Sequence, residues 1–269
     1  MGLLDDRRIL VTGVLTPSSI ASAIAVELQA EGAEIVLTSF GRARSLTERT
    51  ARRFRPVPPI LELDVTRSED FESLTTALTA GGDHLDGIVH SIGNAPPDAL
   101  GGNFLETPWT SVASALQIST YSLQALARAC LPLMRARGGS IVTLDFDARV
   151  AWPHYDWMGV AKAGLEAVVR YLARDLGRHR IRVNAIAAGP LVTMSAKGIP
   201  GFEIFPVRWA AQAPLGWDAR DLRPVARAAA VLLSDYLTAT TGELLHVDGG
   251  YHALGSPLPE SGPGPAATD

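Results

Sequence analysis

The chain is short of the residues on which several classes of protein depend. It has one cysteine, Cys130, among 269 residues, so neither a disulfide framework nor a zinc site built from several cysteines can form within one copy. The six histidines are scattered and none of the spacings of a zinc protease occurs, so we expect no metal. Lysine and arginine (24) do not outnumber aspartate and glutamate (28), and the net charge of −4 gives no reason to expect a nucleic-acid partner.

Long apolar runs are missing as well. No segment approaches the roughly 18–20 consecutive apolar residues of a membrane-spanning helix. Residues 1–13 (MGLLDDRRILVTG) carry charge where a signal peptide needs its apolar stretch. Hydrophobic residues nevertheless make up 47% of the chain and charged residues only 19%, which is too apolar for a disordered protein. We therefore expect a globular cytoplasmic protein without membrane insertion.

Apolar runs of strand length alternate with longer segments of helical periodicity. The expected strands are 8–12, 35–38, 59–63, 87–91, 140–144, 181–186 and 244–247. The expected helices begin near Ile20 and then cover 45–53, 68–78, 111–134, 154–177 and 224–233.

Continuously apolar strands that are separated by helices predict an α/β fold of the Rossmann type. It is a doubly wound, seven-stranded parallel sheet with helices on both faces. No linker interrupts residues 1–254, which predicts a single dinucleotide-binding and catalytic domain. Residues 255–269 are rich in proline and glycine and predict a mobile tail.

Small or polar residues follow the expected strands at the edge where a doubly wound sheet binds its ligand. After the first strand, Gly13 permits a tight turn, and Ser18 and Ser19 can cap the next helix, whose amides favour a pyrophosphate. The full GxGxxG motif is absent because only its first glycine is present. From this segment alone, a dinucleotide site and an ordinary strand-to-helix turn are equally open.

The ends of the next three strands add to the dinucleotide hypothesis. Phe40 follows the second strand and could stack on adenine, but no acid stands where many NAD sites hold the ribose. Arg42 and Arg44 could meet the 2′-phosphate of NADP or could form a solvated helix start. Asp64 after the third strand could accept the adenine amino group, and the segment 91–93 after the fourth lets the backbone approach a cofactor.

Tyr155 and Lys162 form the most informative pair in the chain. They are seven residues apart, so they lie within about 20° of each other on one face of a helix. A tyrosine can donate a hydrogen bond to a developing oxyanion, and a lysine two turns along can hold ribose hydroxyls and lower the pKa of the phenol. The chain has one other lysine, Lys197, and uses arginine elsewhere. An interface tyrosine and a surface lysine remain the alternative.

These segments resemble the short-chain dehydrogenase/reductase superfamily, and within it the enoyl-[acyl-carrier-protein] reductases of the FabI/InhA type. The resemblance covers nearly all of residues 3–254, and the spacing Tyr-x6-Lys is specific to this branch because most of the superfamily has Tyr-x3-Lys. The residues that carry it are Thr12-Gly13, Ser19-Ile20, Leu63-Asp64-Val65, His90-Ser91-Ile92-Gly93, Tyr155-x2-Met158-x3-Lys162, 184–193 (NAIAAGPLVT) and 241–250 (TGELLHVDGG).

The resemblance implies a role for each matching position. It implies that Tyr155, Lys162 and Phe146 are catalytic, with Tyr155 holding the thioester oxygen of the substrate. It implies that Tyr155, Met158 and Asn94 bind the substrate. The cofactor contacts that it implies are Gly13, Ser19, Ile20, Phe40, Asp64, Val65, Ser91, Ile92, Gly93, Ile118, Lys162, Leu191 and Thr193.

The resemblance also implies a reaction and its partners. NADH, with NADPH the less favoured cofactor, would reduce a trans-2-enoyl thioester on acyl-carrier protein or CoA in fatty-acid synthesis. The family is usually a homotetramer built through its long helices, here 111–134 and 154–177. Asn94 stands where an aromatic residue is common, and residues 193–217 are shorter than the substrate loop of the InhA type. We therefore expect a preference for short or medium acyl chains.

Three other readings stay open from the sequence. A reductase of a specialised pathway, polyketide-like or conferring resistance, would carry the same residues. A ketone or alcohol oxidoreductase of the same fold is disfavoured because Val142, thirteen residues before Tyr155, offers no serine partner to the tyrosine. A scaffold that binds NAD without catalysis is disfavoured because Tyr155 and Lys162 are both present.

Overall fold

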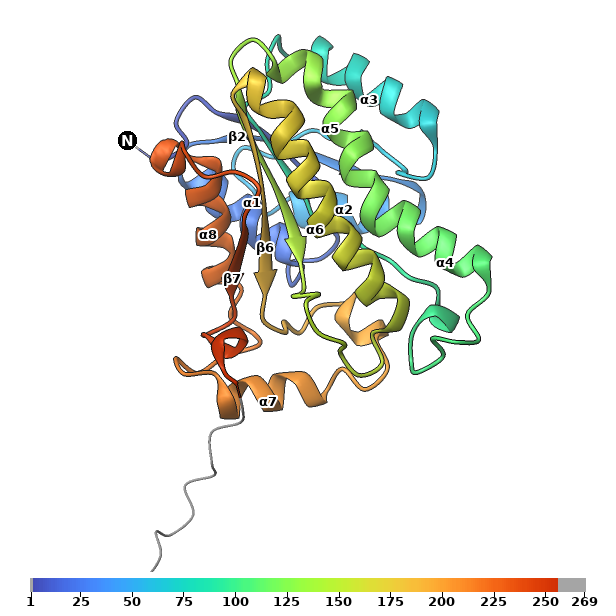
Figure 1. Ribbon diagram of the computed structural model, residues 1–269. Helices are drawn as coiled ribbons and strands as arrows, with labels where there is room; N and C mark the ends of the chain where they lie inside the picture. The colour runs from blue at the N-terminus through green and yellow to red at the C-terminus, as the bar shows by residue number, and fades with distance from the viewer. Residues whose placement is uncertain (1, 256–269) are drawn as a thin grey trace, which may run out of the picture.

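The strands form one parallel sheet, as predicted. A computed structural model describes residues 2–255, and the tail predicted at 255–269 lies outside these residues except for Gly255. The order across the sheet is β3-β2-β1-β4-β5-β6-β7 (Figure 1). The strands are β1 (Arg8–Val11), β2 (Glu34–Ser39), β3 (Ile60–Glu62), β4 (Gly87–His90), β5 (Gly139–Asp145), β6 (Ile181–Ala188) and β7 (Leu244–Val247).

Helices cover both faces of this sheet. α1 and α8 pack against each other on one face, with α2 beside them, and α3, α5 and α6 pack on the other (Figure 1). The helices are α1 (Ile20–Ala30), α2 (Arg44–Ala51), α3 (Ser68–Ala80), α4 (Trp109–Leu116), α5 (Ser122–Met134), α6 (Asp156–Leu176), α7 (Ile204–Gln212) and α8 (Arg223–Leu233).

The alternation of side chains along the strands divides the core into two layers. In β1, Ile9 and Val11 point to the layer under α1 and α8, while Leu10 points to the layer under α3, α5 and α6. All three side chains are almost completely buried. A strand that is buried on both faces must be apolar at every position, which explains the unbroken apolar runs of the sequence.

Two predicted elements differ from the structure. The helix predicted at 111–134 is interrupted by a π-helical turn, Gln117–Tyr121, between α4 and α5. There Ser122 donates to the carbonyl of Ile118, and Thr120 donates to the carbonyl of Ala161 in α6, both at 2.6 Å. The Ser122 hydroxyl thus bonds a carbonyl within the π-helical turn, and the Thr120 hydroxyl ties this turn to α6. A side chain that enters the helical hydrogen-bond ladder is a known cause of helix irregularity.

The second difference is α7, which lies within the segment 193–217 that was expected to be a loop. Its Phe205 and Trp209 are buried, so the helix is held by packing against the rest of the molecule. Pro206 stands in its first turn, where a missing amide hydrogen costs nothing because it has no intrahelical partner. The helix covers the carboxyl ends of the strands at the lower edge of Figure 1.

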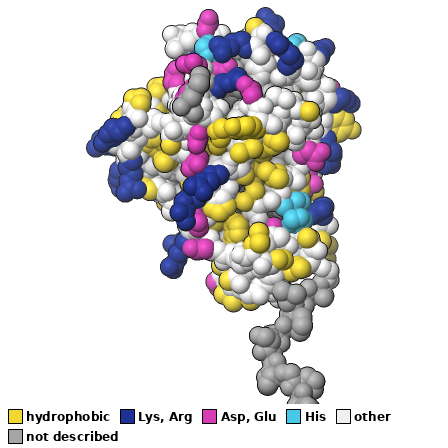
Figure 2. Space-filling view, turned by 90° about the vertical axis from the view of Figure 1, so that its left-hand side faces the viewer, with side chains coloured by type: hydrophobic (Ala, Val, Ile, Leu, Met, Phe, Trp, Pro, Cys, Tyr) yellow, Lys and Arg dark blue, Asp and Glu magenta, His cyan; other side chains and the backbone are white. Residues whose placement is uncertain are grey.

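The surface over α1, α8 and the β7 edge of the sheet carries a concentration of apolar side chains. Figure 2 shows them gathered in the middle of this face, with acidic and basic side chains around them. Within residues 2–255, no helix combines the length and the hydropathy needed to cross a membrane.

Leu10→Ala tests the packing of the central strand. Leu10 is fully buried and lies between Val36 of β2 and Ile88 of β4 in the register of the sheet. Because truncation leaves a cavity in a rigid layer, we expect the free energy of unfolding to fall by about 2–5 kcal/mol in urea titrations. Leu215→Ala is the matched control, since this leucine is 89% exposed, and we expect a change below about 0.5 kcal/mol. Equal losses in the two variants would contradict this account of the core.

Candidate active site

β1 and β4 are neighbours at the point where the strand order of the sheet reverses direction, and we call the space beyond their carboxyl ends the crevice. This switch point is where open α/β sheets bind their ligands. Gly13 has a φ of +81°, and a Cβ atom on it would stand 2.0 Å from the carbonyl oxygen of Ser91. Thr12 ties the two strand ends together, because its hydroxyl donates to Val89 and accepts from the Ser91 amide. The crevice therefore has a glycine floor that no other residue could form without moving the backbone.

The beginning of α1 faces the same crevice. Ser19 is the N-cap residue of this helix, and its hydroxyl accepts a hydrogen bond from the Ser22 amide and donates to the carbonyl of Thr16. Ile20 is the first helical residue. No acidic residue stands in the first turn of α1, so its amide groups present an uncompensated positive end to an anion such as a pyrophosphate.

The ends of β2 and β3 carry the residues predicted to meet adenosine. Phe40 is 44% exposed, which leaves its ring accessible to a ligand. Asp64 accepts hydrogen bonds from the amide and hydroxyl of Thr66, so its carboxylate is partly engaged within its own turn. Val65 is buried in the core beside α3. Arg44 is held by two carboxylates, those of Glu48 and Glu62.

The end of β4 meets the π-helical turn. Ser119 is completely buried, and its hydroxyl joins the amide and the carbonyl of Asn94 at 2.9 Å each. A Cβ atom on Gly93 would lie 3.9 Å from both the Ser119 hydroxyl and Lys162 Nζ. Ile92 and Ile118 pack at the rim of the core below. This turn therefore shapes the crevice wall.

Tyr155 and Lys162 lie at the head of α6, which begins two residues later than the helix predicted at 154–177, so Tyr155 is its N-cap residue. Tyr155 immediately precedes the helix, two turns before Lys162, and each residue is only 8% exposed. Lys162 Nζ donates to the carbonyl of Leu144 at 2.7 Å and lies 3.7 Å from Oδ1 of Asp145. Its ammonium is thus anchored to the carboxyl end of β5, beside the crevice.

Burial shifts the pKa values of Tyr155, Lys162 and the neighbouring Asp145. Burial raises the pKa of Tyr155 far above its usual value, and the nearby Asp145 adds to the rise. Burial lowers the pKa of Lys162, while Asp145 opposes that change. Burial raises the pKa of Asp145 to about 7 although Lys162 favours its charged form. The phenol is therefore fully protonated at neutral pH and can act as a hydrogen-bond donor.

Asp145 is a site residue that the sequence analysis missed. Its side chain is completely buried, and among residues 2–255 neither carboxylate oxygen has a hydrogen-bond partner. A carboxylate at the last position of a buried strand is unusual, because charged groups are rarely buried without a partner. The sequence Asp145-Phe146-Asp147 contains two carboxylates, and nothing in the order of these residues indicates which of the two lies beside Lys162.

Aromatic side chains form the wall beside Tyr155. Phe146 meets the Tyr155 ring edge to face with centroids 5.4 Å apart, and Met158 packs in the same cluster. Beyond Phe146 follow Trp152 and Trp209, with centroid distances from its ring of 5.1 and 5.9 Å. A pocket of about 350 Å³ lies behind this wall and has both histidine and aromatic lining residues. Phe146, Trp152 and Trp209 line this pocket and Tyr155 does not, so the aromatic wall lies between Tyr155 and the pocket.

The segment after β6 completes the enclosure. Leu191 is buried in the core beneath the crevice. Thr193 is nearly buried, and its hydroxyl accepts from the amide of Ala196 as the chain turns toward α7. The structure therefore brings most of the predicted site residues to one edge of the sheet. Phe40, Asp64 and Val65 lie apart from the Tyr155 cluster, at the β2–β3 end of the same edge.

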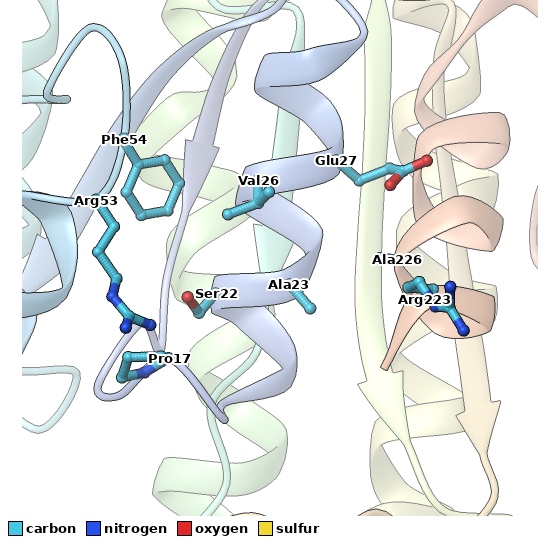
Figure 3. Close-up of a pocket in the computed structure, with 9 residues that line it drawn as sticks. All are labelled: Pro17, Ser22, Ala23, Val26, Glu27, Arg53, Phe54, Arg223 and Ala226. Carbon is cyan, nitrogen blue, oxygen red and sulfur yellow. The ribbon is translucent and has the colours of Figure 1, made fainter. Parts of the chain in front are cut away.

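A separate hollow of about 200 Å³ lies on the outer side of α1 and does not belong to this site. Figure 3 shows Arg53 and Phe54 on one side of it and Arg223 of α8 on the other, with Ser22 and Val26 of α1 between them. No residue predicted for catalysis or cofactor binding lines it. Across the described part of the chain, no group of three or more histidine, cysteine, aspartate or glutamate residues could hold a metal ion.

The fold and this edge of the sheet are those of a short-chain dehydrogenase/reductase. The model of a family described as Enoyl-(Acyl carrier protein) reductase matches residues 13–252, and the chain belongs to that family. It is 44% identical over 263 residues to the enoyl-[acyl-carrier-protein] reductase [NADH] of Mycolicibacterium smegmatis, covering 93% of this chain and 97% of that protein. It is 40% identical over 262 residues to the FabI protein with the same description from Aquifex aeolicus, covering 95% and 94%.

His90 is a second buried group that the sequence analysis left without a role. Its ring nitrogens lie 2.8 Å from the Thr143 hydroxyl on β5 and 2.9 Å from the Ser122 hydroxyl on α5. Burial lowers the pKa of His90 to about 3, with a further contribution from the charge of Lys162. The neutral imidazole therefore joins the end of β4 to its neighbours just below the crevice.

This environment predicts a pH dependence of stability. The unfolded histidine takes up a proton below about pH 6.5 while the folded one stays neutral, so its contribution is present above pH 6.5 and is lost as the pH falls toward 3. Between pH 7.5 and 5.0, we expect wild type to lose about 2 kcal/mol more unfolding free energy than His90→Gln. Urea titrations at the two pH values measure the difference. Parallel losses in both proteins would show that His90 is protonated in the native state.

Proposed function

We propose that this chain is an NADH-dependent enoyl reductase, which converts trans-2-enoyl thioesters on acyl-carrier protein or CoA to saturated acyl thioesters in fatty-acid synthesis. The observation that carries the proposal is the buried pair formed by Tyr155 and Lys162 at the head of α6, beside the switch-point crevice. The family of the chain and the names of its relatives support the same reaction.

The crevice suits a dinucleotide. The floor at Gly13 has no space for a Cβ atom, so a ligand there meets backbone only. The amide groups at the start of α1, after Ser19, would hold the pyrophosphate, and Lys162 Nζ would bind the hydroxyls of the nicotinamide ribose. NADH, when bound, supplies the hydride for the β-carbon of the substrate.

Side chains of the protein would position the substrate and stabilise the negative charge that develops on it. As negative charge moves onto the thioester oxygen, the neutral phenol of Tyr155 donates a hydrogen bond to it. One such preorganised donor is worth about 3–4 kcal/mol, or roughly 10²–10³ in rate. The α-carbon would then take a proton from water, so Tyr155 need not give up its own. This fits a phenol whose pKa is raised by burial, since such a phenol keeps its hydrogen. Phe146, Met158 and Asn94 would form walls of the acyl site.

The adenosine end favours NADH over NADPH. The carboxylate of Glu62 accepts hydrogen bonds from the Gly41 amide and from Arg44, directly beyond the end of β2. The guanidinium of Arg44 therefore forms ion pairs with carboxylates and is not free to bind a phosphate. The two carboxylates and one guanidinium leave a net negative charge at the end of β2, which would repel a 2′-phosphate and is compatible with ribose hydroxyls.

A homotetramer in the cytoplasm is the assembly that we propose on the resemblance to the family. The helices that would form its interfaces are α5, with the turn before it, and α6. Tyr121 of this turn and Val160 and Tyr171 of α6 are large apolar side chains that are exposed to solvent in the single chain. Single exposed apolar residues are common at surfaces, so the proposal of association rests mainly on the resemblance to the family.

A panel of thioesters tests the reaction. We expect NADH oxidation with trans-2-enoyl thioesters and none with 3-ketoacyl thioesters, because Val142 gives the tyrosine no serine partner for ketone reduction. We expect faster turnover of short and medium acyl chains than of long ones, since the segment from Thr193 to Trp217 is short and aromatic rings close the space beyond Phe146. The measurement is the loss of NADH absorbance with each thioester.

The panel also separates the alternatives. Turnover of the ketone alone would identify a ketoacyl oxidoreductase, and tight NADH binding without any turnover would identify a non-catalytic scaffold. Equal turnover of long-chain enoyl thioesters would overturn the chain-length expectation only. A comparison of carrier-protein and CoA thioesters of one chain length identifies the preferred carrier.

Substitutions at the central pair separate its two roles. Tyr155→Phe keeps the ring and removes the donor, so we expect turnover to fall by roughly 10²–10³ while the Kd for NADH stays unchanged. Lys162→Ala removes the ammonium, so we expect weaker NADH binding, measured by fluorescence titration. If Tyr155→Phe weakened NADH binding as much as it slowed turnover, the assignment of its hydroxyl to the substrate would be wrong.

A further inference from the structure

The backbone on both sides of Tyr155 is strained. His154 has a φ of +61° and Asp156 a φ of +40°, in the left-handed region that residues with a side chain rarely adopt. Such residues persist only where their surroundings hold them, and they concentrate at functional sites. Tyr155 thus sits in the middle of a turn that would relax if nothing held it.

One short segment holds both flanks of this turn. The amide of Gly101 donates to the carbonyl of His154 at 3.0 Å. The amides of Gly102 and Asn103 both donate to the same carboxylate oxygen of Asp156, at 2.6 and 3.1 Å. Gly101 and Gly102 have φ values of +82° and +95°, which lets successive amides converge on one anion as in a backbone nest.

The same segment also continues into the apolar cluster around Tyr155. Leu100, directly before it, is buried in one apolar cluster with Tyr155 and Met158. Directly after it, Phe104 stacks on Trp157 with centroids 4.9 Å apart and accepts a hydrogen bond from its indole. The loop 100–104 therefore fixes the turn 154–157 through its backbone, through one carboxylate and through apolar packing.

We propose that Asp156 is a positioning residue, whose carboxylate gathers the Gly102 and Asn103 amides and so holds the strained turn that aims the Tyr155 hydroxyl. The inference rests on the proposed function of Tyr155. Asp156 acts through the backbone of its neighbour. Removal of the Asp156 carboxylate should therefore slow the chemical step and leave the cofactor site intact.

A simpler role for Asp156 is that of an acid in the first turn of α6, which would interact with the helix dipole. That role predicts a change in melting temperature with no specific effect on kcat. The two hydrogen bonds go to the loop and not to the first turn of α6, so removal of the carboxylate frees the loop from the turn.

Three substitutions separate strain from hydrogen bonding. Asp156→Asn keeps one oxygen acceptor, which is sufficient because the Gly102 and Asn103 amides both donate to a single oxygen of Asp156. Asparagine also tolerates a positive φ. We expect its kcat to stay close to wild type. Asp156→Gly relieves the strain but removes the acceptor, and Asp156→Ala removes the acceptor and keeps the strain. We expect both to lower kcat for an enoyl thioester by about 10- to 100-fold, with the Kd for NADH unchanged.

Asp6→Gly is the matched control, because Asp6 also has a positive φ, +60°, and lies exposed before β1, at the opposite edge of the sheet. It should leave kcat at the wild-type value. Melting temperatures and NADH titrations of every variant identify those that are folded. Wild-type kcat in folded Asp156→Gly and Asp156→Ala would overturn the inference, and so would a loss of NADH affinity that matches the loss of kcat.

Tyr155→Phe in the same series keeps this test distinct from that of the proposed function. If Tyr155→Phe turns over like wild type, the role assigned to the phenol fails. If Tyr155→Phe is slow while Asp156→Gly and Asp156→Ala are not, only the role of Asp156 fails. A slow Asp156→Asn beside an equally slow Asp156→Ala would show that the acceptor oxygen is not what matters, and would also overturn the inference.

Discussion

The site depends on keeping an ammonium and a phenol out of water at the end of a strand. Lys162 loses its hydration on burial, and the carbonyl of Leu144 and the carboxylate of Asp145 replace part of it. Tyr155 loses its hydration as well and keeps its proton as a result. Both groups are therefore ordered before any ligand arrives, so the cost of their desolvation is part of the folding free energy and not of binding.

This constraint explains why the surroundings are so rigid. The floor of the crevice requires glycine at position 13, because the Ser91 carbonyl occupies the place of its side chain. Below it, His90 links β4 to β5 and α5 through hydrogen bonds with two hydroxyl groups, and burial keeps its ring neutral. Beside it, Ser119 fixes the backbone of Asn94 from a π-helical turn. Small polar side chains thus hold the strand ends at fixed separations.

The sequence was sufficient to predict the parallel sheet and to single out Tyr155 and Lys162 as neighbours near the start of one helix, for identifiable reasons. Strands buried on both faces leave unbroken apolar runs, and Tyr155 and Lys162 are close in the chain. Asp145, Ser119 and His90 were not assigned, because each acts on a partner 17 to 53 residues away and has no local signature. α7 was missed because tertiary packing of Phe205 and Trp209 decides its conformation, not its local pattern. The π-helical turn depends on hydroxyl contacts that only the fold creates.

The aromatic wall formed by Phe146, Trp152 and Trp209 links Tyr155 and Lys162 to the shape of the neighbouring space, which we propose as the acyl site. Asp145 lies beside Lys162, and Phe146, the next residue in the chain, packs against the ring of Tyr155. The position of the Asp145 backbone therefore also sets the position of Phe146. Trp152 continues the wall, and its indole donates to the carbonyl of Asp147, which fixes the bend between β5 and the strained turn. One stretch of chain therefore carries the counter-charge of the lysine, the wall of the pocket and the turn that presents the phenol. Because the three are joined by one short stretch of backbone, a backbone shift at one of them would be passed to its neighbours, which would couple the electrostatics of the lysine to the shape of the pocket.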